Sequence, residues 1–301
     1  MNLRFLEAFV WVARLGSFKA AADKLHTTQA AISARIATLE DQFGVRLFER
    51  DKRHVTLTHS GSDLLGHAEE ILAVSARMMD AVADRASVRG TVVVGAIETV
   101  VHTWLPELLR RFGERFPQAS LELRSNSTPA LHEELLKGHL DLTFTADQLS
   151  EPAIDNLRIC TFSVHWVIGA ALTGSRDHEV LDRQPVLTFL PGTFIYRDTV
   201  AKIEARGGGR VNPISSLAAM VSLLKSGYGV ATLPHAAIQR EVQAGELSLL
   251  DIDPSLDPMP VFASMRTQAD SPLVPALVCL AGEAVLAFAE RSPAGTVLAP
   301  D

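Results

Sequence analysis

The start of the chain alternates apolar and polar positions with the period of short amphipathic helices. The apolar face of the first predicted helix is formed by Phe5, Phe9, Val12 and Leu15. Gly16 is suited to end that helix, and Ser17 can cap a second helix over residues 18–25. The pattern therefore predicts two short helices separated by a tight break.

A third helix is predicted over residues 27–40, after a turn at His26 and Thr27, with Thr28 as its cap. Its buried face is formed by Ala31, Ile32, Ile36 and Leu39. The opposite face carries short, nearly uncharged side chains, namely Gln29, Ala30, Ser33, Ala34 and Ala37. Such small side chains let a helix lie deep in a major groove, where glutamine pairs with an adenine edge and serine with several bases. A merely solvated helix would carry more Lys and Glu, so this pattern predicts the reading helix of a helix-turn-helix.

A basic hairpin is predicted directly after Gly44. Two short β-forming runs, residues 46–50 and 54–58, enclose Asp51, Lys52 and Arg53. This arrangement indicates the wing of a winged helix-turn-helix, in which Arg50, Lys52, Arg53 and His54 would face phosphates.

The next segment has the spacing of a coiled-coil seam. Apolar and small residues alternate four and three positions apart at Leu64, Ala68, Ile71, Ser75, Met78 and Val82. The alternative is an ordinary helix packed on its own domain. Because the seam lies between the wing and a linker over residues 87–90, we expect its partner to be a second copy of the chain, which would hold two reading helices at a fixed distance.

Beyond Gly90 the chain alternates predicted strands and helices, which indicates an α/β layout with a parallel sheet. Strands are predicted at 91–96, 120–124, 140–145, 164–170, 186–190, 211–214, 230–233 and 247–250. Helices are predicted at 104–116, 129–137, 199–205, 217–226 and 235–244. A return crossing near Val261–Met265 and a closing helix over 273–288 complete two lobes: residues 91–163 with 266–295, and residues 164–265.

A cleft between two such lobes is a candidate ligand site. In open α/β sheets, ligands bind at the carboxyl ends of strands, where helix N-termini offer unpaired amides. This rule selects residues 97–99, 125–128, 145–147 and 192–194, together with Ser215 and Ser216. Each hydroxyl among them can also be a simple cap or turn former, so the convergence of several is the stronger indication.

Charge is distributed unevenly along the chain. The net charge is −7, but residues 1–61 hold nine Lys and Arg against six Asp and Glu, a balance of +3 that leaves −10 for the remainder. The basic charge therefore lies where DNA would bind, and its modest size implies salt-sensitive binding strengthened by dimerisation.

Composition also excludes several classes of protein. No apolar run approaches the roughly 20 residues that span a bilayer, and the N-terminus lacks the order of a signal peptide, so we expect a cytoplasmic protein without a membrane partner. Cys160 and Cys279 are expected to be buried free thiols, and the histidines lack metal-ligand spacing. No nucleophile elbow, paired carboxylates or nucleotide fingerprint indicates an enzyme, and no cofactor is expected.

The residues of the first segment resemble those of the LysR-type transcriptional regulators. The match comprises Gly16-Ser17-Phe18, Ala20-Ala21-Ala22, Leu25, Gln29, Ala31, Ser33, Leu39-Glu40, Gly44, Leu47-Phe48-Glu49-Arg50, Arg53, Leu57-Thr58 and Gly61. So many spaced matches over about sixty residues are highly specific. The chain departs where many members carry Arg, because Ala34 stands there and Arg35 follows.

The resemblance extends more loosely to the rest of the chain. Gly227-Tyr228-Gly229-Val230 with Leu233-Pro234 is similar to the signature of the second lobe of an effector domain built like a periplasmic solute-binding protein. By that similarity the effector pocket would be lined by Glu98, Thr99, Ser127, Thr128, Thr145, Thr193, Phe194 and Ser216. Glu98 stands where many members have a neutral residue, and it would disfavour an anionic effector unless Arg197 or His102 offsets its charge.

The resemblance implies a winged helix-turn-helix in residues 1–61, a dimerising helix and hinge in 62–90 and a two-lobed effector domain in 91–295. The residues expected at DNA are Ser17, Lys19, Thr27, Thr28, Gln29, Ala30, Ser33, Ala34, Arg35, Arg50, Lys52, Arg53 and His54. The implied partners are a pseudo-palindromic duplex, a small-molecule effector, further copies of the chain as a dimer of dimers, and RNA polymerase as a further candidate. The alternative function is an architectural DNA-binding protein whose cleft is vestigial.

Overall fold

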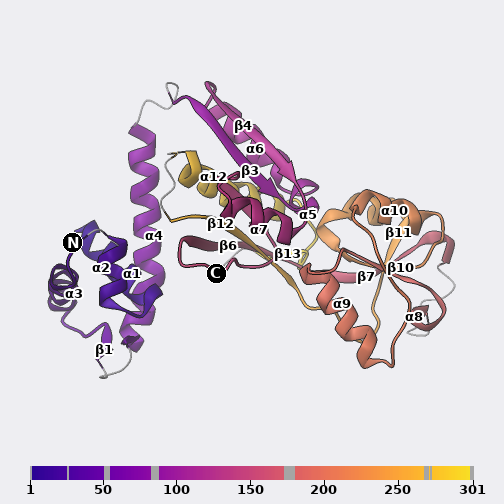
Figure 1. Cartoon of the computed structure of the whole chain (residues 1–301), viewed down its shortest axis with the longest axis horizontal. Helices are drawn as coiled ribbons and strands as arrows, with labels where there is room; N and C mark the ends of the chain where they lie inside the picture. The colour runs from indigo at the N-terminus through magenta and orange to yellow at the C-terminus, as the bar shows by residue number, and fades with distance from the viewer. Residues whose placement is uncertain are drawn as a thin grey trace. The chain divides into compact units, whose positions relative to one another are not determined.

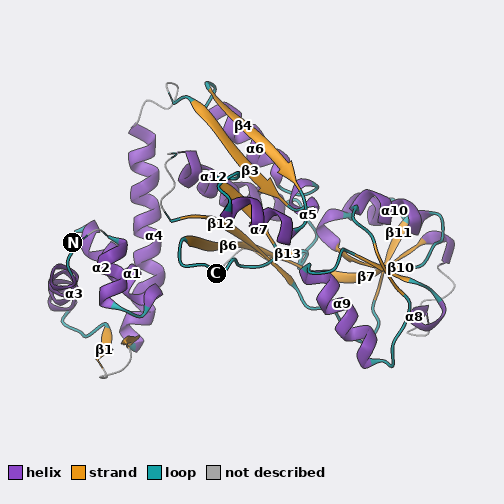
Figure 2. Cartoon of the chain, in the orientation of Figure 1, coloured by secondary structure: helices purple, strands orange, loops and turns teal. Residues whose placement is uncertain are grey.

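The computed structural model describes residues 2–25, 27–50, 55–82, 88–172, 180–267, 271 and 273–298. The chain divides into two compact units, Met1–Arg85 and Ala86–Asp301. Figures 1 and 2 show the helices and strands of both units. Within the described ranges, no helix combines the length and the apolar character needed to cross a bilayer.

The N-terminal unit is mainly helical. Its elements are α1 (Leu3–Leu15), α2 (Phe18–Lys24), α3 (Gln29–Phe43), β1 (Phe48–Arg50), β2 (Val55–Leu57) and α4 (His59–Val82). β1 and β2 pair antiparallel, with Phe48 opposite Leu57 and Arg50 opposite Val55. This unit confirms the predicted helix-turn-helix followed by a hairpin.

The ends of these helices follow from local chemistry. Ser17 caps α2 by accepting a hydrogen bond from the amide of Ala20 at 3.2 Å. Gly16 and Gly44 end α1 and α3 with φ of 58° and 69°, a left-handed conformation that costs glycine no side-chain clash. The core beneath the helices includes the rings of Phe9 and Phe48, whose centroids lie 5.4 Å apart.

The first lobe of the C-terminal unit is built on a six-stranded sheet, in the order β13-β6-β12-β5-β3-β4. Its strands are β3 (Gly90–Ala96), β4 (Ala119–Ser125), β5 (Leu142–Thr145), β6 (Ile154–Phe162), β12 (Met259–Arg266) and β13 (Val297–Leu298). Its helices are α5 (Glu98–Val101), α6 (Leu105–Arg115), α7 (Thr128–Leu136) and α12 (Leu273–Ala289).

The second lobe is built on a five-stranded sheet, in the order β11-β7-β10-β8-β9. Its strands are β7 (Val164–Gly169), β8 (Val186–Thr188), β9 (Val211–Pro213), β10 (Val230–Pro234) and β11 (Leu247–Leu250). Its helices are α8 (Val180–Arg183), α9 (Phe194–Ala205), α10 (Leu217–Lys225) and α11 (Gln239–Gln243), with short 3-10 turns at Ala170–Leu172 and His235–Ala237.

Two sequence-based expectations about these sheets were wrong. The sheets are mixed rather than parallel, because β12 runs antiparallel to β5 and β6, and β7 runs antiparallel to β10 and β11. The segment Val261–Met265 was placed at the crossing out of the second lobe, but it lies inside β12, where Phe262 pairs with Thr145 of the first-lobe sheet. The chain therefore returns to the first lobe within residues 251–258.

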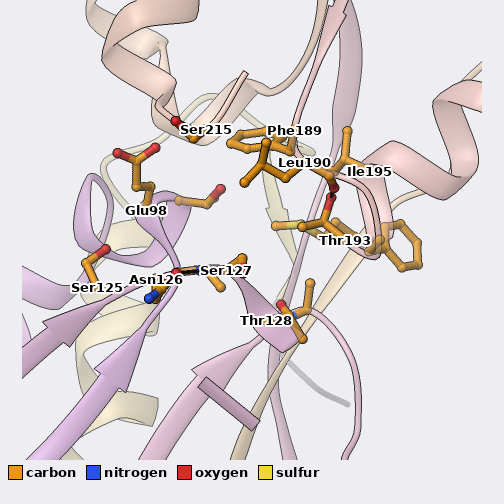
Figure 3. A pocket seen from close by; sticks show the side chains of 15 residues that line it. Glu98, Ser125, Asn126, Ser127, Thr128, Phe189, Leu190, Thr193, Ile195 and Ser215 are labelled. Atoms are coloured by element: carbon orange, nitrogen blue, oxygen red, sulfur yellow. Dashed lines mark hydrogen bonds between the residues drawn. The ribbon is translucent and has the colours of Figure 1, made fainter. Parts of the chain in front are cut away.

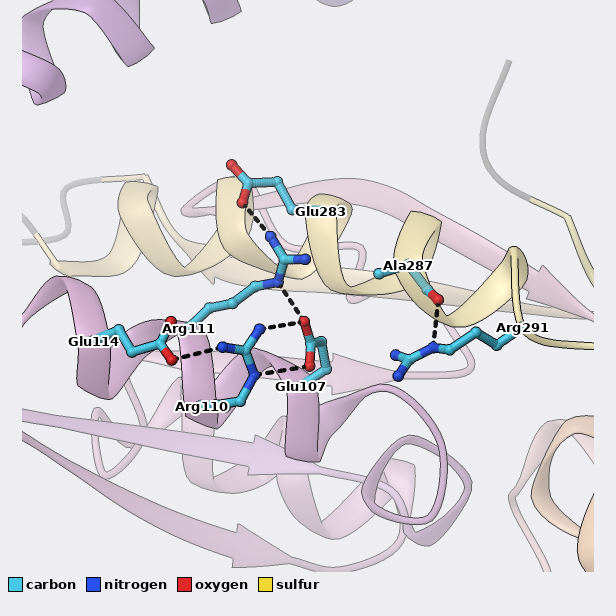
Figure 4. A network of polar contacts seen from close by, with 7 residues as sticks. All are labelled: Glu107, Arg110, Arg111, Glu114, Glu283, Ala287 and Arg291. Atoms are coloured by element: carbon cyan, nitrogen blue, oxygen red, sulfur yellow. Dashed lines mark hydrogen bonds and ion pairs between the residues drawn. The ribbon is translucent and has the colours of Figure 1, made fainter.

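An ion-pair network joins α6 to α12 in the first lobe (Figure 4). Arg110 donates to both carboxylate oxygens of Glu107, at 2.7 and 3.1 Å, and Arg111 donates to Glu107 at 2.8 Å and to Glu283 at 2.9 Å. The hydrogen bonds from Arg110 and then Arg111 lower the pKa of Glu107 from 4.5 to about 2. Glu107 is thus the centre of a bidentate and bridging contact between two helices.

Replacing Glu107 with Gln should lower the thermal midpoint of unfolding in a pH-dependent way. Because the folded-state pKa is depressed, the charge of Glu107 stabilises the protein above its ordinary pKa of 4.5 and is lost as pH falls from 4.5 through about 2. The difference in midpoint between wild type and variant should be present at neutral pH and disappear across that window. Glu204→Gln, an exposed site on α9, is the matched control. A difference that stays constant with pH would contradict a charge-based contribution.

Candidate functional site

The start of α3 exposes the face that the sequence pattern predicted. Ile32, Ile36 and Leu39 are fully buried. Exposed side chains on the other side are those of Thr28, Gln29, Ala30, Ala34 and Ala37, while Ser33 and Arg35 are half-buried. Because the first two turns of α3 carry only Ala and Ser beside Gln29, the helix can approach a base pair closely. Gln29 is the long polar side chain on this face that can reach a base edge.

Residues flanking this face combine exposure with capping roles. The Thr28 hydroxyl accepts from the amide of Ala31 at 3.2 Å and caps α3 while remaining exposed. Ser17 is half-buried and occupied by its cap on α2, and Lys19 is exposed on the same helix. Thr27 is half-buried, and its amide donates to the carbonyl of Ala22 at 2.9 Å. The residues expected at DNA outside the α3 face thus include the caps of two helices and one exposed lysine.

Glu40 fixes the base of the hairpin to the end of α3. Its Oε1 accepts hydrogen bonds from the amides of Leu47 at 2.8 Å and Phe48 at 3.4 Å. Across the same junction, the Thr58 hydroxyl donates to the carbonyl of Arg46 at 2.8 Å. The sequence pattern identified Glu40 only as a family match, because its partners lie seven and eight residues away in a non-helical turn. Its geometry makes it a positioning residue for the hairpin.

Four side chains expected to face phosphates from the wing lie outside the description of the structure. Lys52, Arg53 and His54 lie outside the described residues, as does the side chain of Arg50. Their contact with phosphates stays a prediction from the sequence.

The first half of the predicted dimer seam packs on its own subunit. Ala68 is fully buried in the core of the N-terminal unit, and Leu64 and Ile71 pack partly buried against that core. The assignment of Ala68 to a contact with a second copy was therefore wrong, because α1 already covers it and an ion pair of 2.9 Å between Arg14 and Glu69 joins the same two helices. The side chains of Ser75, Met78 and Val82 lie outside the described residues.

A cavity of about 280 Å³ lies between the two lobes of the C-terminal unit (Figure 3). From the first lobe and the strand that returns to it, the cavity is lined by Ile97, Glu98, Thr99, Ser125, Asn126, Ser127, Thr128, Ala146 and Met259. From the second lobe it is lined by Phe189, Leu190, Thr193, Phe194, Ile195 and Ser215. Most of these residues directly follow the parallel strands β3, β4, β5, β8 and β9, as the rule for open α/β sheets predicts.

The hydroxyls of the cavity differ in what they can offer a ligand. Thr193 donates to the carbonyl of Leu190 at 2.8 Å and accepts from the amide of Tyr196, so it is committed to capping α9. Thr128 is buried and accepts from the amide of Ala146 at 3.4 Å. In the part of the chain that the structure describes, the hydroxyls of Ser127 and Ser215 have no protein partner. They are the groups best placed to hydrogen-bond a guest.

Two of the residues predicted to bind an effector do not line the cavity. Thr145 is fully buried, where its hydroxyl donates to the carbonyl of Asp147 at 3.1 Å and lies 3.0 Å from Nε2 of His132. Ser216 accepts from the amide of Ala219 and caps α10, while its neighbour Ser215 lines the cavity. The end of a strand predicts the segment that lies at the cleft. It does not predict which of two consecutive side chains faces the cleft, because successive side chains point in opposite directions.

The apolar half of the lining was missed by the sequence analysis. Phe189, Leu190, Ile195 and Met259 face the cavity, and the first two follow β8, where the strand-end rule could have selected them. A buried trio of hydroxyls, Thr188, Thr199 and Thr232, also went unrecognised. Hydrogen bonds of 2.9 Å from Thr199 to Thr232 and from Thr232 to Thr188 tie α9 to β8 and β10, and so fix the helix start beside the cavity.

Glu98 is the only ionisable side chain among the described residues that line the cavity. Its Oε2 accepts from the amide of Leu217, so the carboxylate reaches from α5 in the first lobe to the start of α10 in the second. Arg197 does not offset this charge, because its guanidinium donates to Asp147 at 2.6 Å and to the carbonyl of Gly192 at 2.9 Å. The Arg197–Asp147 pair is a second polar contact between the lobes.

Other chemistry near the cavity is limited. Burial lowers the pKa of His132 and raises that of the Cys160 thiol to about 12, so the first favours neutral imidazole and the second an unreactive thiol. In the described ranges no three His, Cys, Asp or Glu side chains gather as metal ligands would. The arrangement can bind a small molecule by hydrogen bonds and apolar contact.

Two family models match the chain. The model described as "Bacterial regulatory helix-turn-helix protein, lysR family" matches residues 3–62, and the model described as "LysR substrate binding domain" matches residues 85–285. A relative from Streptomyces viridosporus, named a probable hydrogen peroxide-inducible genes activator, is 32% identical over 250 residues, which is 80% of each chain.

Solved structures share the fold along nearly the whole chain. Oxidised OxyR from Corynebacterium glutamicum superimposes with a TM-score of 0.63 at 22% identity, over 95% of this chain and 92% of that one. Full-length CbnR in complex with its target DNA gives a TM-score of 0.52 at 23% identity, over 94% of this chain and 99% of that one. Both comparisons agree with a helix-turn-helix unit followed by a two-lobed α/β unit.

Proposed function

Because the chain belongs to the LysR family of bacterial transcriptional regulators, we propose that the start of α3 reads base edges in duplex DNA and that the cavity between the lobes holds the effector. The protein is a DNA-binding transcription regulator with an effector-binding domain, and not an enzyme. Regulators of this family bind DNA and small-molecule effectors and form oligomers. The likeness of the two lobes to periplasmic binding proteins is one of architecture only.

The observation that carries the DNA-reading proposal is the exposed small-residue face at the start of α3. Gln29 lies on the first turn, flanked by Ala30 and Ala34, and the buried residues of the helix fix its opposite side. Glu40 holds the hairpin against the end of the same helix, which supports a wing placed to follow the backbone beside the groove. Base contacts then specify the site, while the wing and helix N-termini position the protein on phosphates.

We assign residues 1–61 to DNA binding, 62–90 to dimerisation and the hinge, and 91–295 to effector binding, with both crossings between lobes at Ser163 and within 251–258. With Ala68 excluded, the seam proposed for a partner copy keeps Leu64, Ile71, Ser75, Met78 and Val82. Two copies would read a pseudo-palindromic operator, and a dimer of dimers would read two. We place the regulator in the cytoplasm, with RNA polymerase as a further partner.

Selection of duplexes from a random library by the full-length protein tests this function. The expected result is enrichment of inverted half-sites centred about 10 base pairs apart, the spacing of successive major grooves on one side of the helix. Repeating the selection with a small-molecule extract of the source cells should shift the yield or the spacing of enriched sites if the cavity is a working effector site. Uniform recovery of all sequences would contradict sequence-specific reading.

A further inference from the structure

We propose that the cavity between the lobes selects a small organic cation, a primary ammonium or guanidinium group on an apolar body, and that the Glu98 carboxylate receives the cationic nitrogen. The inference rests on the proposed function, because it names the chemical class of the effector at that same site. It begins from the charges that face the cavity. Glu98 is the sole ionisable side chain among its described lining residues, and Figure 3 shows it beside Ser215.

The Glu98 carboxylate has acceptor capacity to spare. In the described structure it takes part in one hydrogen bond, in which Oε2 accepts from the amide of Leu217. A carboxylate accepts several hydrogen bonds and donates none, so Oε1 can receive an N–H of a ligand but repels a ligand carboxylate. A guest cation at this place would pair with a partly desolvated charge.

The N-terminus of α10 and the cations nearest the cavity are already occupied by the protein. The positive end of α10, where an anionic ligand could bind in the second lobe, is taken by Glu98 itself through Leu217. The guanidinium of Arg197 is held by Asp147 at 2.6 Å and by the carbonyl of Gly192. Burial lowers the pKa of His132, and its Nε2 lies against Thr145 behind the cavity wall. An anionic guest would therefore meet one negative charge and no available cation.

The other residues that line the cavity determine which groups the ligand carries besides its cationic nitrogen. Phe189, Leu190, Ile195 and Met259 offer apolar contact, and the hydroxyls of Ser127 and Ser215 offer neutral hydrogen bonds. The N-terminus of α7 (Thr128–Leu136) also opens on the cavity at Ser127, so an amino acid whose carboxylate lies there fits the same cationic requirement as a simple amine. The shared chemistry is the cationic nitrogen.

Binding of matched probes to the full-length protein tests the inference. The probes are 2-phenylethylamine, L-phenylalanine, 2-phenylethanol and phenylacetate, which share an aromatic body and differ in charge, measured by calorimetry with wild type and Glu98→Gln. We expect the amine, the amino acid or both to bind wild type at least about tenfold more tightly than phenylacetate, and Glu98→Gln to lose about tenfold for those cations while 2-phenylethanol changes little. Comparing the affinities for 2-phenylethylamine and L-phenylalanine shows whether the cavity prefers a simple amine or a zwitterion.

Two further variants sharpen the test. Glu204→Gln removes an exposed carboxylate of α9 away from the cavity and should leave every affinity unchanged. Leu190→Trp fills the cavity and should abolish binding of every probe. Tighter binding of phenylacetate than of both cations, no effect of Glu98→Gln, or no binding of either cation at millimolar concentration overturns the inference. If, in such a case, phenylacetate or 2-phenylethanol binds and Leu190→Trp abolishes that binding, the cavity is still the effector site and only the preference for a cation is wrong. If Leu190→Trp leaves all binding intact, the effector site lies elsewhere.

Discussion

Replacing Gln29 with Ala should remove most of the sequence-specific affinity of the protein while leaving its affinity for random DNA nearly unchanged. Gln29 is exposed on the first turn of α3, between the Thr28 cap and Ala30, with no bulky neighbour on its face. A bidentate contact between an amide side chain and an adenine edge contributes about 1–3 kcal/mol. Two half-sites together would lose about 2–6 kcal/mol, which is at least about thirtyfold in the dissociation constant.

The measurement is a pair of titrations, on a duplex from the selected pool and on a shuffled duplex, at one salt concentration, because phosphate contacts make affinities depend on salt. Gln42→Ala is the matched control, since Gln42 is an exposed glutamine at the far end of the same helix. It should leave both affinities near wild type. An equal loss on both duplexes for Gln29→Ala would take Gln29 out of base reading and make it a general support of the complex.

The N-terminal unit was predictable from sequence because its signals are local. Ser17 and Thr28 each stand one position before a helix, and their side chains accept hydrogen bonds from amides in its first turn. Gly16 and Gly44 stand at helix ends where the backbone takes a left-handed conformation. Local signals also explain why the strand ends of the C-terminal unit predicted most of the residues that line the cavity. A β-strand followed by hydroxyl residues and a helix is readable within about ten residues of chain.

The failures concern partners far away in the sequence. The residues of β12 carry no local signal that Phe262 pairs with Thr145 of the first lobe. The predicted return of the chain from the second lobe to the first was therefore too late in the sequence. Ala68 matched a coiled-coil position, but α1, more than fifty residues earlier, had already covered it. The first turns of α4 thus contribute to the core of their own unit, and the fully buried Ala68 is not available for contact with a second copy.

Glu98 sets the charge of the cavity, because it is the only ionisable side chain among the described residues that line it. Two of the polar contacts between the lobes lie beside the cavity, that of Glu98 with the amide of Leu217 and that of Arg197 with Asp147. In both contacts the protein supplies opposite charges or dipoles from its own two lobes, so closure does not need an anion from outside. Among the described residues that line the cavity, these contacts leave the second oxygen of Glu98 and the hydroxyls of Ser125, Ser127 and Ser215 without a protein partner.

Two glycines on the same helix should respond in opposite directions to the same substitution by Ala. Gly61 lies in the first turn of α4, where a Cβ would stand 2.2 Å from the carbonyl oxygen of Leu47, a backbone atom just ahead of β1. That carbonyl also accepts from the amide of Thr58 at 3.0 Å, so it cannot move without loosening the hairpin. Gly66 is exposed five residues later, and a Cβ there would meet nothing within 4 Å.

Gly61→Ala should destabilise the N-terminal unit by about 3 kcal/mol, the upper range for forcing atoms into a packed junction. Gly66→Ala should stabilise it by about 0.5–1 kcal/mol, because alanine loses less backbone entropy in a helix interior. Hydrogen exchange of the full-length protein, followed by mass spectrometry, measures both effects locally. Peptides from residues 3–62 should exchange faster in Gly61→Ala and more slowly in Gly66→Ala, and peptides from 88–298 should not change. If Gly61→Ala left α1–α3 and the hairpin as protected as in wild type, the close approach of α4 to Leu47 would not be a feature of the protein in solution, and the hairpin would need another anchor to stay beside the reading helix.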